Sequence, residues 1–401
     1  MSIIKYAKLF VRTIENDKWL YEYEILSGMT KRHSFFGIND KFNIYFRIPM
    51  IRPLFIVLFP FILLFFVCWE GLKTSLQVLK LKRTILRSDT FFLATTNFSS
   101  SINNRINKQI GNACWILNTN IHSNSYIIKG NRYISCYRLI SLFDVLKIGL
   151  GSILSYVFIC KQYGVFYMLE SINSYRWLLY YRACQRIPIE SSIFFINHKD
   201  RWAFLDDHIN CKTKTLIQHG TEIIKCKRES DLLRNMIELP NGGFVQNMPN
   251  KYKTLTHVIA LSEKEVQALK SSIIESNPEF KIGGYGFETY PLESNKYSVL
   301  IIAHSGIYLD KEINIIQNLQ DFPIDLYVKN HPTQNNDVYV KLLTKYRFTL
   351  ITEQKFPHVD VVITYDSTLA HEYSSVGIKV IYHTQHNIEE IRKYIQYNYE
   401  Q

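Results

Sequence analysis

The chain has 401 residues, which is enough for two or three domains with hydrophobic cores of their own. Its 47% hydrophobic and 14% aromatic content, with 20% charged residues, excludes an intrinsically disordered protein. The formal net charge of +12 points to an anionic partner, such as a nucleotide phosphate or a membrane surface. Because the sequence contains neither a dense run of Lys and Arg nor a nucleic-acid-binding motif, we do not expect that partner to be nucleic acid.

The seven cysteines are scattered singly, and none forms a CxxC pair. The spacing therefore predicts neither a zinc site nor a disulfide framework, and we interpret the cysteines as reduced, buried thiols. The run Asp206-Asp207-His208 lacks a complete ligand set and is expected on a solvated helix. No metal site is predicted.

Residues 1–90 are predicted to form a basic and hydrophobic membrane-associated region. Within it, residues 53–69 form an apolar run of 17 residues without a charge. A spanning helix needs roughly 17–25 such residues, whereas a core helix usually has about 10–14. Pro60 would kink the helix, so a helix that dips into one leaflet fits as well as a span. Basic residues flank the run and suit anionic headgroups of a cytoplasmic leaflet. A buried core helix is the alternative.

Residues 91–290 are predicted to form a first Rossmann-like domain, with the weakest pattern over 91–190. From residue 192 onward, short apolar runs alternate with helical segments, which predicts βαβ units. Strands are expected over 193–196, 215–217 and 256–261, and a helix over 263–274. Ser262 and Glu265 fit a capping box at the start of that helix.

Residues 291–401 are predicted to form a second Rossmann-like domain. Helices are expected over 369–375 and 388–397. The expected strands cover residues 298–303, 324–328, 348–351, 359–364 and 379–383. Runs of this kind are typical of a parallel sheet that is buried on both faces. Ligands of such sheets bind beyond the carboxyl ends of the strands, so the chemistry is expected there.

The first candidate residue at a strand end is His219. It follows the strand over 215–217 and precedes Gly220, which allows a ligand to approach the backbone closely. An imidazole with a pKa near neutrality is suited to deprotonating an acceptor hydroxyl. The alternative is a structural histidine, which is the commoner role at a strand end.

Three further strand ends carry candidate anion-binding residues. His331 is held extended by the following Pro332 and, with Lys329, could bind a diphosphate. Ser367 and Thr368 stand where a strand turns into a helix, and hydroxyls with free N–H groups there favour an anion. An ordinary helix cap is the alternative. Ser305 and Gly306 form a similar turn.

Taken in order, these stretches resemble two groups of bacterial transferases. The resemblance is carried by Gln218-His219-Gly220-Thr221, Gly284-Tyr285, Val328-Lys329-Asn330-His331-Pro332 and Val361 to Thr368, and it covers roughly residues 192–385. One group is the CDP-glycerol glycerophosphotransferases of teichoic acid synthesis. The other is the capsular sialyl-, polysialyl- and Kdo-transferases with their "HP" and "SS/ST" motifs.

The resemblance implies a GT-B fold, in which two Rossmann-like domains face a cleft, with an acceptor domain first and a nucleotide-donor domain second. It also implies that His219 is the general base, with Gly220 and Thr221 on the acceptor side. His331, Ser367 and Thr368 would bind the donor phosphate. The chain departs from the glycerophosphotransferase pattern at Gln218, where that family has Trp, and at Tyr365-Asp366, where it has Asp-Tyr.

The expected function is that of an inverting glycosyltransferase that needs neither a metal nor a cofactor beyond its nucleotide-sugar substrate. Its acceptor would be a lipid-linked or polymeric glycan of a bacterial surface polysaccharide, such as capsule or O-antigen. Its place would be the anionic cytoplasmic face of the inner membrane. One alternative is a CDP-polyol phosphotransferase that uses the same residues. The other is a catalytically silent scaffold subunit of polysaccharide assembly.

Overall fold

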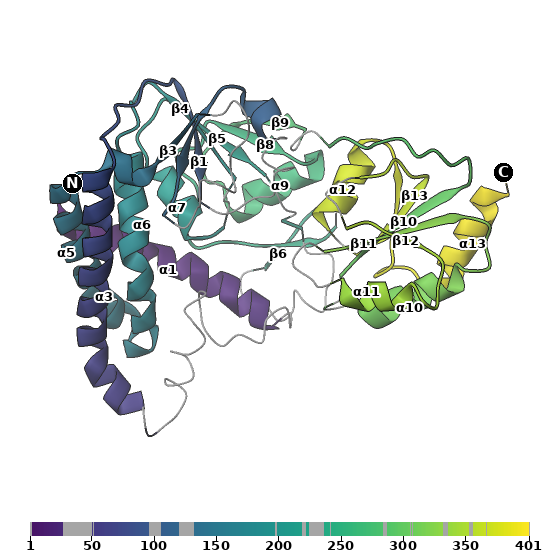
Figure 1. The fold of residues 1–401 in the computed structure, drawn as a ribbon, viewed down its shortest axis with the longest axis horizontal. Coiled ribbons are helices and arrows are strands. Elements are labelled where there is room, and N and C mark those ends of the chain that lie inside the picture. The colour runs from purple at the N-terminus through teal and green to yellow at the C-terminus, as the bar shows by residue number, and fades with distance from the viewer. Residues whose placement is uncertain are drawn as a thin grey trace. The chain divides into compact units, whose positions relative to one another are not determined.

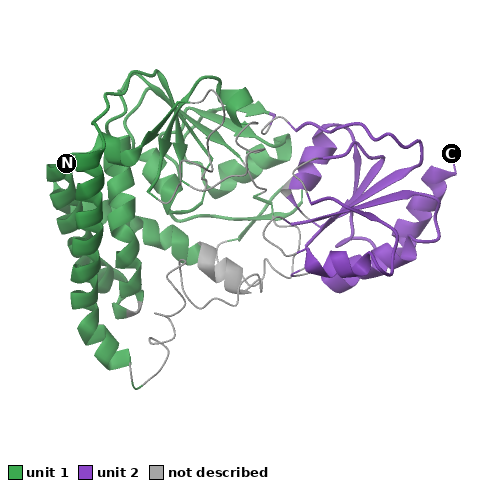
Figure 2. Cartoon of the chain, in the orientation of Figure 1, with its two compact units in different colours: residues 1–218, 222–282 green, residues 219–221, 283–401 purple. Residues whose placement is uncertain are grey.

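The computed structural model divides the chain into two compact units, residues 1–218 with 222–282 and residues 219–221 with 283–401 (Figure 2). For residues 20–26, 166 and 368 only the backbone is described. The described residues are 2–26, 50, 52–95, 106–119, 132–196, 199–218, 222–223, 236–240, 242–283, 287–304, 306, 308–331, 336–352, 356–365 and 367–400. The division places the apolar run 53–69 in the same unit as the first sheet. The break follows residue 282, whereas the sequence analysis put it after residue 290.

The first unit is built on a parallel sheet of seven described strands (Figure 1). In spatial order these are β3 (Tyr133–Ser135), β2 (Cys114–Leu117), β1 (Thr90–Ala94), β4 (Ser192–Phe195), β5 (Thr213–Ile217), β8 (His257–Ala260) and β9 (Glu279–Ile282). A separate antiparallel pair is formed by β6 (Met236–Glu238) and β7 (Phe244–Gln246). The order of the sheet reverses between β1 and β4, as in doubly wound folds.

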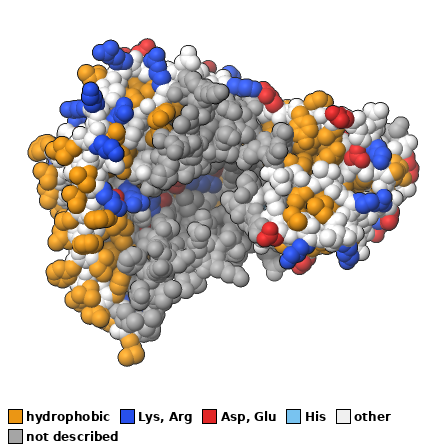
Figure 3. Space-filling model, viewed as in Figure 1, with side chains coloured by type: hydrophobic (Ala, Val, Ile, Leu, Met, Phe, Trp, Pro, Cys, Tyr) orange, Lys and Arg blue, Asp and Glu red, His pale blue; other side chains and the backbone are white. Residues whose placement is uncertain are grey.

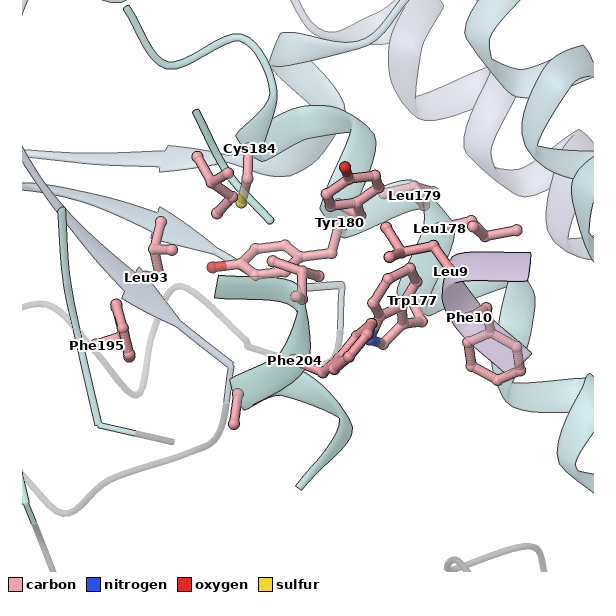
Figure 4. Close-up of a cluster of buried hydrophobic side chains, with 14 of the residues drawn as sticks. Leu9, Phe10, Leu93, Trp177, Leu178, Leu179, Tyr180, Cys184, Phe195 and Phe204 are labelled. Atoms are coloured by element: carbon pink, nitrogen blue, oxygen red, sulfur yellow. The ribbon is translucent and has the colours of Figure 1, made fainter. Parts of the chain in front are cut away.

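Four long helices form a layer beside this sheet. They are α1 (Ile3–Leu26), α3 (Arg52–Lys80), α5 (Leu142–Tyr163) and α6 (Ser171–Cys184). Phe10 of α1 packs against Trp177 of α6, with ring centroids 5.7 Å apart. Leu93 of β1 and Phe195 of β4 belong to the same buried cluster (Figure 4). The helical layer and the sheet therefore share one core. The described part of the unit also contains the shorter helices η2 (Cys136–Leu139), η3 (Val165–Glu170), α7 (Arg201–Asp207) and α9 (Glu263–Ser272).

The predicted apolar run 53–69 lies inside α3, which continues through Pro60 to Lys80. Of the helices in the described ranges, α3 and α5 are long and apolar enough to cross a membrane by length and composition. In their most apolar stretches, 28% of the residues of α3 and 39% of those of α5 are buried.

The second unit has a five-stranded parallel sheet among its described residues. In spatial order its strands are β12 (Thr349–Leu350), β11 (Asp325–Asn330), β10 (Ser298–Ala303), β13 (Val361–Thr364) and β14 (Lys379–Tyr382). One face packs on α10 (Leu309–Asn318), α11 (Asp337–Leu342) and α13 (Ile388–Tyr399), and the other on α12 (Thr368–Ser375). The strand order reverses between β10 and β13.

Both sheets are parallel. The first sheet lies beside the layer of long helices, and the second sheet has helices on both faces. The predicted α/β class with two Rossmann-like domains, which are the elements of a GT-B fold, is confirmed by these sheets. The cleft between the domains stays a prediction.

Candidate active site

The carboxyl ends of four neighbouring strands in the second unit bring aromatic and polar residues together. Ile302 of β10 pairs with Lys329 of β11 and with Thr364 of β13. Thr364 in turn pairs with Tyr382 of β14. The residues that directly follow the ends of these four strands therefore meet at one edge of the sheet. They are His304, His331, Tyr365 and His383.

Backbone hydrogen bonds extend the pairing just past the strands. The amide of His331 donates to the carbonyl of Ala303 at 2.9 Å. The amide of His383 donates to the carbonyl of Thr364 at 2.8 Å. This edge includes the point between β10 and β13 where the strand order reverses, which is where doubly wound sheets bind ligands.

The rings at this edge form a connected chain. The His304 ring lies 5.1 Å from the His331 ring and 5.6 Å from the Tyr365 ring, measured between centroids. Tyr308 then contacts Tyr365 at 5.5 Å and His383 at 5.4 Å. His304 thus connects the predicted residue His331 with the turn that leads to Ser367.

Glu312 on α10 contacts this series of rings and the backbone next to it. Its side chain is fully buried and accepts a hydrogen bond from the backbone amide of His304 at 2.7 Å. Its second oxygen accepts from the Tyr339 hydroxyl. The Nε2 atom of His383 lies 4.0 Å from the same carboxyl group. These contacts hold the backbone at His304 in place.

Burial sets the charge of the site. It lowers the pKa of His304, and burial together with repulsion from His304 lowers the pKa of His331. Burial also lowers the pKa of His383 to about 4 and raises the pKa of Glu312. The imidazoles are therefore neutral near pH 7 without a ligand, and an anion beside them would favour their protonated forms. The Nδ1 atom of His304 is buried and has no hydrogen-bond partner among the described residues, which leaves it for a bound group.

Lys329 is on β11, two residues before His331, which directly follows the strand. Because side chains alternate along a strand, both lie on the same face of the sheet. Its Nζ atom lies 5.3 Å from the centroid of the Phe356 ring. Burial lowers the pKa of Lys329 to about 8, so the ammonium form still predominates at neutral pH. The predicted pair of Lys329 and His331 therefore combines a cation with a neutral imidazole.

Ser367 is the N-cap of α12. Its Oγ atom accepts from the backbone amide of Ala370 at 3.2 Å and lies 3.4 Å from the Oγ1 atom of Thr364. The hydroxyl thus has the capping role that the sequence analysis gave as the alternative, and its O–H remains able to donate. Thr368 is the first residue of α12.

The remaining predicted residues are placed as follows. Gly306 lies in the turn after β10. Ser305 and the three residues His219, Gly220 and Thr221 lie outside the described residues, so their roles stay predictions.

The residues before and after the predicted general base segment 219–221 are Gln218 and Glu222, and both are hydrogen-bonded. Gln218 is buried, donates from Nε2 to Glu265 at 2.7 Å and accepts from the amide of Leu261 at 3.0 Å. The amide of Glu222 donates to the same Glu265 carboxylate at 2.9 Å. Ser262 caps α9 as predicted, but Glu265 bonds to this turn instead of completing a capping box. Gln218 and Glu222 are therefore both held by Glu265 of α9.

His304, Tyr365, His383, Tyr308 and Glu312 were not among the predicted site residues. The sequence signal that could have indicated the site is a histidine or a tyrosine directly after each of the four strands, of which only His331 was among the predicted site residues. The sequence pattern places His383 at the end of a predicted strand, and it places His304 directly before the predicted residues Ser305 and Gly306. The sequence does not show which strand ends lie next to each other, because that depends on the order of the strands in the sheet.

A cavity of about 590 Å³ lies elsewhere in the second unit. Ser298, Asp360 and His358 line it at the amino ends of β10 and β13. The opposite edge of the sheet carries His304, His331, Tyr365 and His383 and is called the histidine edge below. Parallel sheets of this kind bind ligands at the other edge, so we do not assign it a role.

No protein-family model matches the chain, and no curated protein matches its sequence. Among solved structures, the wall teichoic acid polymerase TagF, in a crystal soaked with CDPG, is similar at 12% identity and a TM-score of 0.42, over 78% of this chain and 74% of that one. MurG of Acinetobacter baumannii is similar at 13% identity and a TM-score of 0.30, over 78% of this chain and 91% of that one. At these TM-scores neither similarity assigns an activity to the chain.

Proposed function

We propose that the protein is a glycosyltransferase that moves a sugar from a nucleotide-sugar donor to a growing bacterial surface polysaccharide, such as capsule or O-antigen, at the cytoplasmic face of the inner membrane. The observation that carries the proposal is the edge of the second sheet, where His304 contacts both His331 and Tyr365 at the switch point. Neutral imidazoles, a buried lysine and a helix N-terminus are together suited to a phosphate group.

In the proposed reaction, His219 removes the proton from the acceptor hydroxyl, and the acceptor oxygen attacks the anomeric carbon of the donor. The bond from that carbon to the phosphate oxygen breaks, and the nucleotide leaves with the electron pair. His331 and Lys329 stabilise the charge that develops on the leaving phosphate. A single displacement of this kind inverts the anomeric centre.

The test is nucleotide binding, measured by calorimetry on detergent-purified protein with CMP, CDP, UDP, dTDP and GDP. We expect one base to be preferred, and we expect His331→Ala to weaken its binding about tenfold or more, since a hydrogen bond to a charged group is lost. His358→Ala is the matched control. This exposed histidine lies at the opposite edge of the same sheet and should have no effect on binding.

Three outcomes separate the candidates. Selective binding that is lost in His331→Ala, together with a glycosidic product, supports the proposal. A phosphodiester product would identify a CDP-polyol phosphotransferase instead. Folded protein that binds no nucleotide would support the scaffold role and contradict the proposal.

A further inference from the structure

One side of α3 is exposed and apolar along its whole length. The helix buries Phe55, Phe59, Leu63 and Val67, which recur every four residues, against the rest of the first unit. The opposite side remains exposed, and in Figure 3 hydrophobic side chains gather over the part of the first unit where α3 lies. Its members include Val57 (65% exposed), Phe61 (69%), Phe65 (73%) and Leu72 (54%).

The structure adds a second exposed apolar stripe, on α5. This stripe falls outside the apolar run 53–69. Its members, at helical spacing, are Phe143 (63% exposed), Leu146 (67%), Leu150 (53%) and Val157 (50%).

The two helices pack side by side and antiparallel. The Phe59 ring lies 5.8 Å from the Tyr156 ring, near one end of the pair. Further along, a Cβ atom at Gly149 would lie 3.4 Å from Val67 Cγ1, and one at Gly71 would lie 4.0 Å from Val145 Cγ1. Rising residue numbers on α3 thus meet falling numbers on α5. The two stripes therefore lie on neighbouring helices.

Lysines stack on aromatic rings at one end of this helix pair. Lys73 Nζ lies 4.9 Å from the ring centroid of Trp69, and Lys147 Nζ lies 4.4 Å from that of Phe143. Because the helices are antiparallel, both pairs lie near the crossing of Gly71 and Val145. Exposed basic residues continue from the end of α3 onward, at Lys80, Lys82, Arg83 and Arg87. Amphipathic aromatic and basic side chains of this kind suit the headgroup region of an anionic leaflet.

The packing of α1 argues against a membrane-spanning orientation. α1 crosses α5 near the middle, where a Cβ atom at Gly151 would lie 3.9 Å from Tyr6 Cβ. Lys8 Nζ lies 5.8 Å from the Phe158 ring centroid, and Lys5 and Arg12 are exposed on the same helix. If α3 and α5 spanned a bilayer in this packing, these cations would lie within the hydrocarbon, which is costly.

We propose that the exposed stripes of α3 and α5 form one lipid-docking surface that lies in the plane of a single anionic leaflet. Apolar side chains enter the acyl boundary, and the lysines contact headgroup phosphates, as for interfacial amphipathic helices. The inference deepens the membrane partner of the proposed function. It is tested without donor or acceptor, so it fails or succeeds independently of the transferase activity.

The first experiment measures how deeply residues of α3 and α5 enter the bilayer. In a Trp69→Phe background, a single tryptophan is placed at Val57, Phe61, Phe65, Leu146 or Leu150. Quenching is then compared in phosphatidylglycerol-containing vesicles whose lipids carry bromine near the headgroup or near the bilayer centre, with the background protein subtracted. We expect the same shallow depth at all five positions. Deep quenching at Phe61 and Phe65 with shallow quenching at Val57 would indicate a span and overturn the proposal.

The second experiment measures vesicle binding by sedimentation. Phe65→Glu on α3 and Leu146→Glu on α5 are each expected to weaken binding about tenfold or more, because one apolar side chain no longer leaves water and a charge is added. Val340→Glu, at a 51% exposed site on α11 of the second unit, is the matched control and should bind like the wild type. Wild-type binding by Leu146→Glu would remove α5 from the surface. Absence of binding to vesicles with or without phosphatidylglycerol would overturn the docking surface altogether.

Discussion

At the scale of single residues, the histidine edge predicts a pH-dependent affinity. His304 and His331 have lowered pKa values, and a bound anion raises them, so binding takes up protons. Lys329, with a pKa lowered to about 8, adds to the effect in the same direction, while Tyr365, whose pKa is raised by burial, stays neutral. Nucleotide affinity should therefore increase as the pH falls from about 8 to about 6.5, by up to about tenfold per pH unit for each proton taken up.

Calorimetry in two buffers with different heats of ionisation measures this proton uptake directly. His304→Gln keeps a hydrogen-bond donor but cannot be protonated, so it should bind with a shallower pH dependence than the wild type. An affinity that does not vary with pH, with no proton taken up, would contradict the assignment of the imidazoles to an anion site.

At the scale of secondary-structure elements, α5 is one of the elements of the first unit that the sequence did not predict. Gly149, Gly151 and Ser152 interrupt its apolar pattern and suggest a break. In the structure the glycines allow close helix packing, and the Oγ atoms of Ser152 and Ser155 donate to carbonyls one turn earlier, at 2.9 and 2.8 Å. The strand over 298–303, by contrast, was predicted from a short uninterrupted run that contains the β-branched residues Val299, Ile301 and Ile302, and all six of its residues are buried.

The close packing at Gly151 can be tested by substitution. A Cβ atom there would lie 3.2 Å from Leu178 Cδ1 on α6, so Gly151→Leu should lower the free energy of unfolding by about 1–3 kcal/mol through overpacking. Gly149→Ala is the control, because its Cβ atom makes an ordinary contact and alanine favours the helix by up to about 1 kcal/mol. Chemical denaturation followed by circular dichroism compares the two. Equal stability of both variants would show that α5 and α6 are not packed as described.

At the scale of the whole molecule, the sequence was sufficient for the fold class, because it rests on local patterns. The role of His331, which also rests on a local pattern, stays a prediction. The sequence did not reveal the sheet order, and so it did not reveal that His304 contacts both His331 and Tyr365. The union of the N-terminal helices with the first sheet was also missed, because it depends on contacts between residues far apart in the chain. Arg201, at the start of α7, shows this most clearly.

Arg201 is a buried guanidinium on α7 that joins α1 to η3. Its Nε atom lies 2.9 Å from Asp17 Oδ2 on α1, and its NH2 group lies 3.2 Å from Glu170 Oε2. Asp17→Ala removes one carboxylate from a buried ion group and is expected to lower the free energy of unfolding by about 3 kcal/mol. Denaturant titration measures the loss, with Glu275→Ala as the control, since Glu275 pairs with Lys253 at an exposed site. A loss below that of the control would mean that α1 is not part of this core.

The antiparallel packing of α3 and α5 also bears on how the chain is made. The last residue of α3 is Lys80 and the first of α5 is Leu142, so the buried side of α3 leaves the ribosome 62 residues ahead of the helix that covers it (142 − 80). At about 5–20 residues per second, this side of α3 waits roughly 3–12 seconds for its partner. During this time the side of α3 that is buried in the folded protein is uncovered. The lipid-docking surface proposed above would then have a second consequence, because early contact of α3 with a membrane would protect the nascent chain from aggregation.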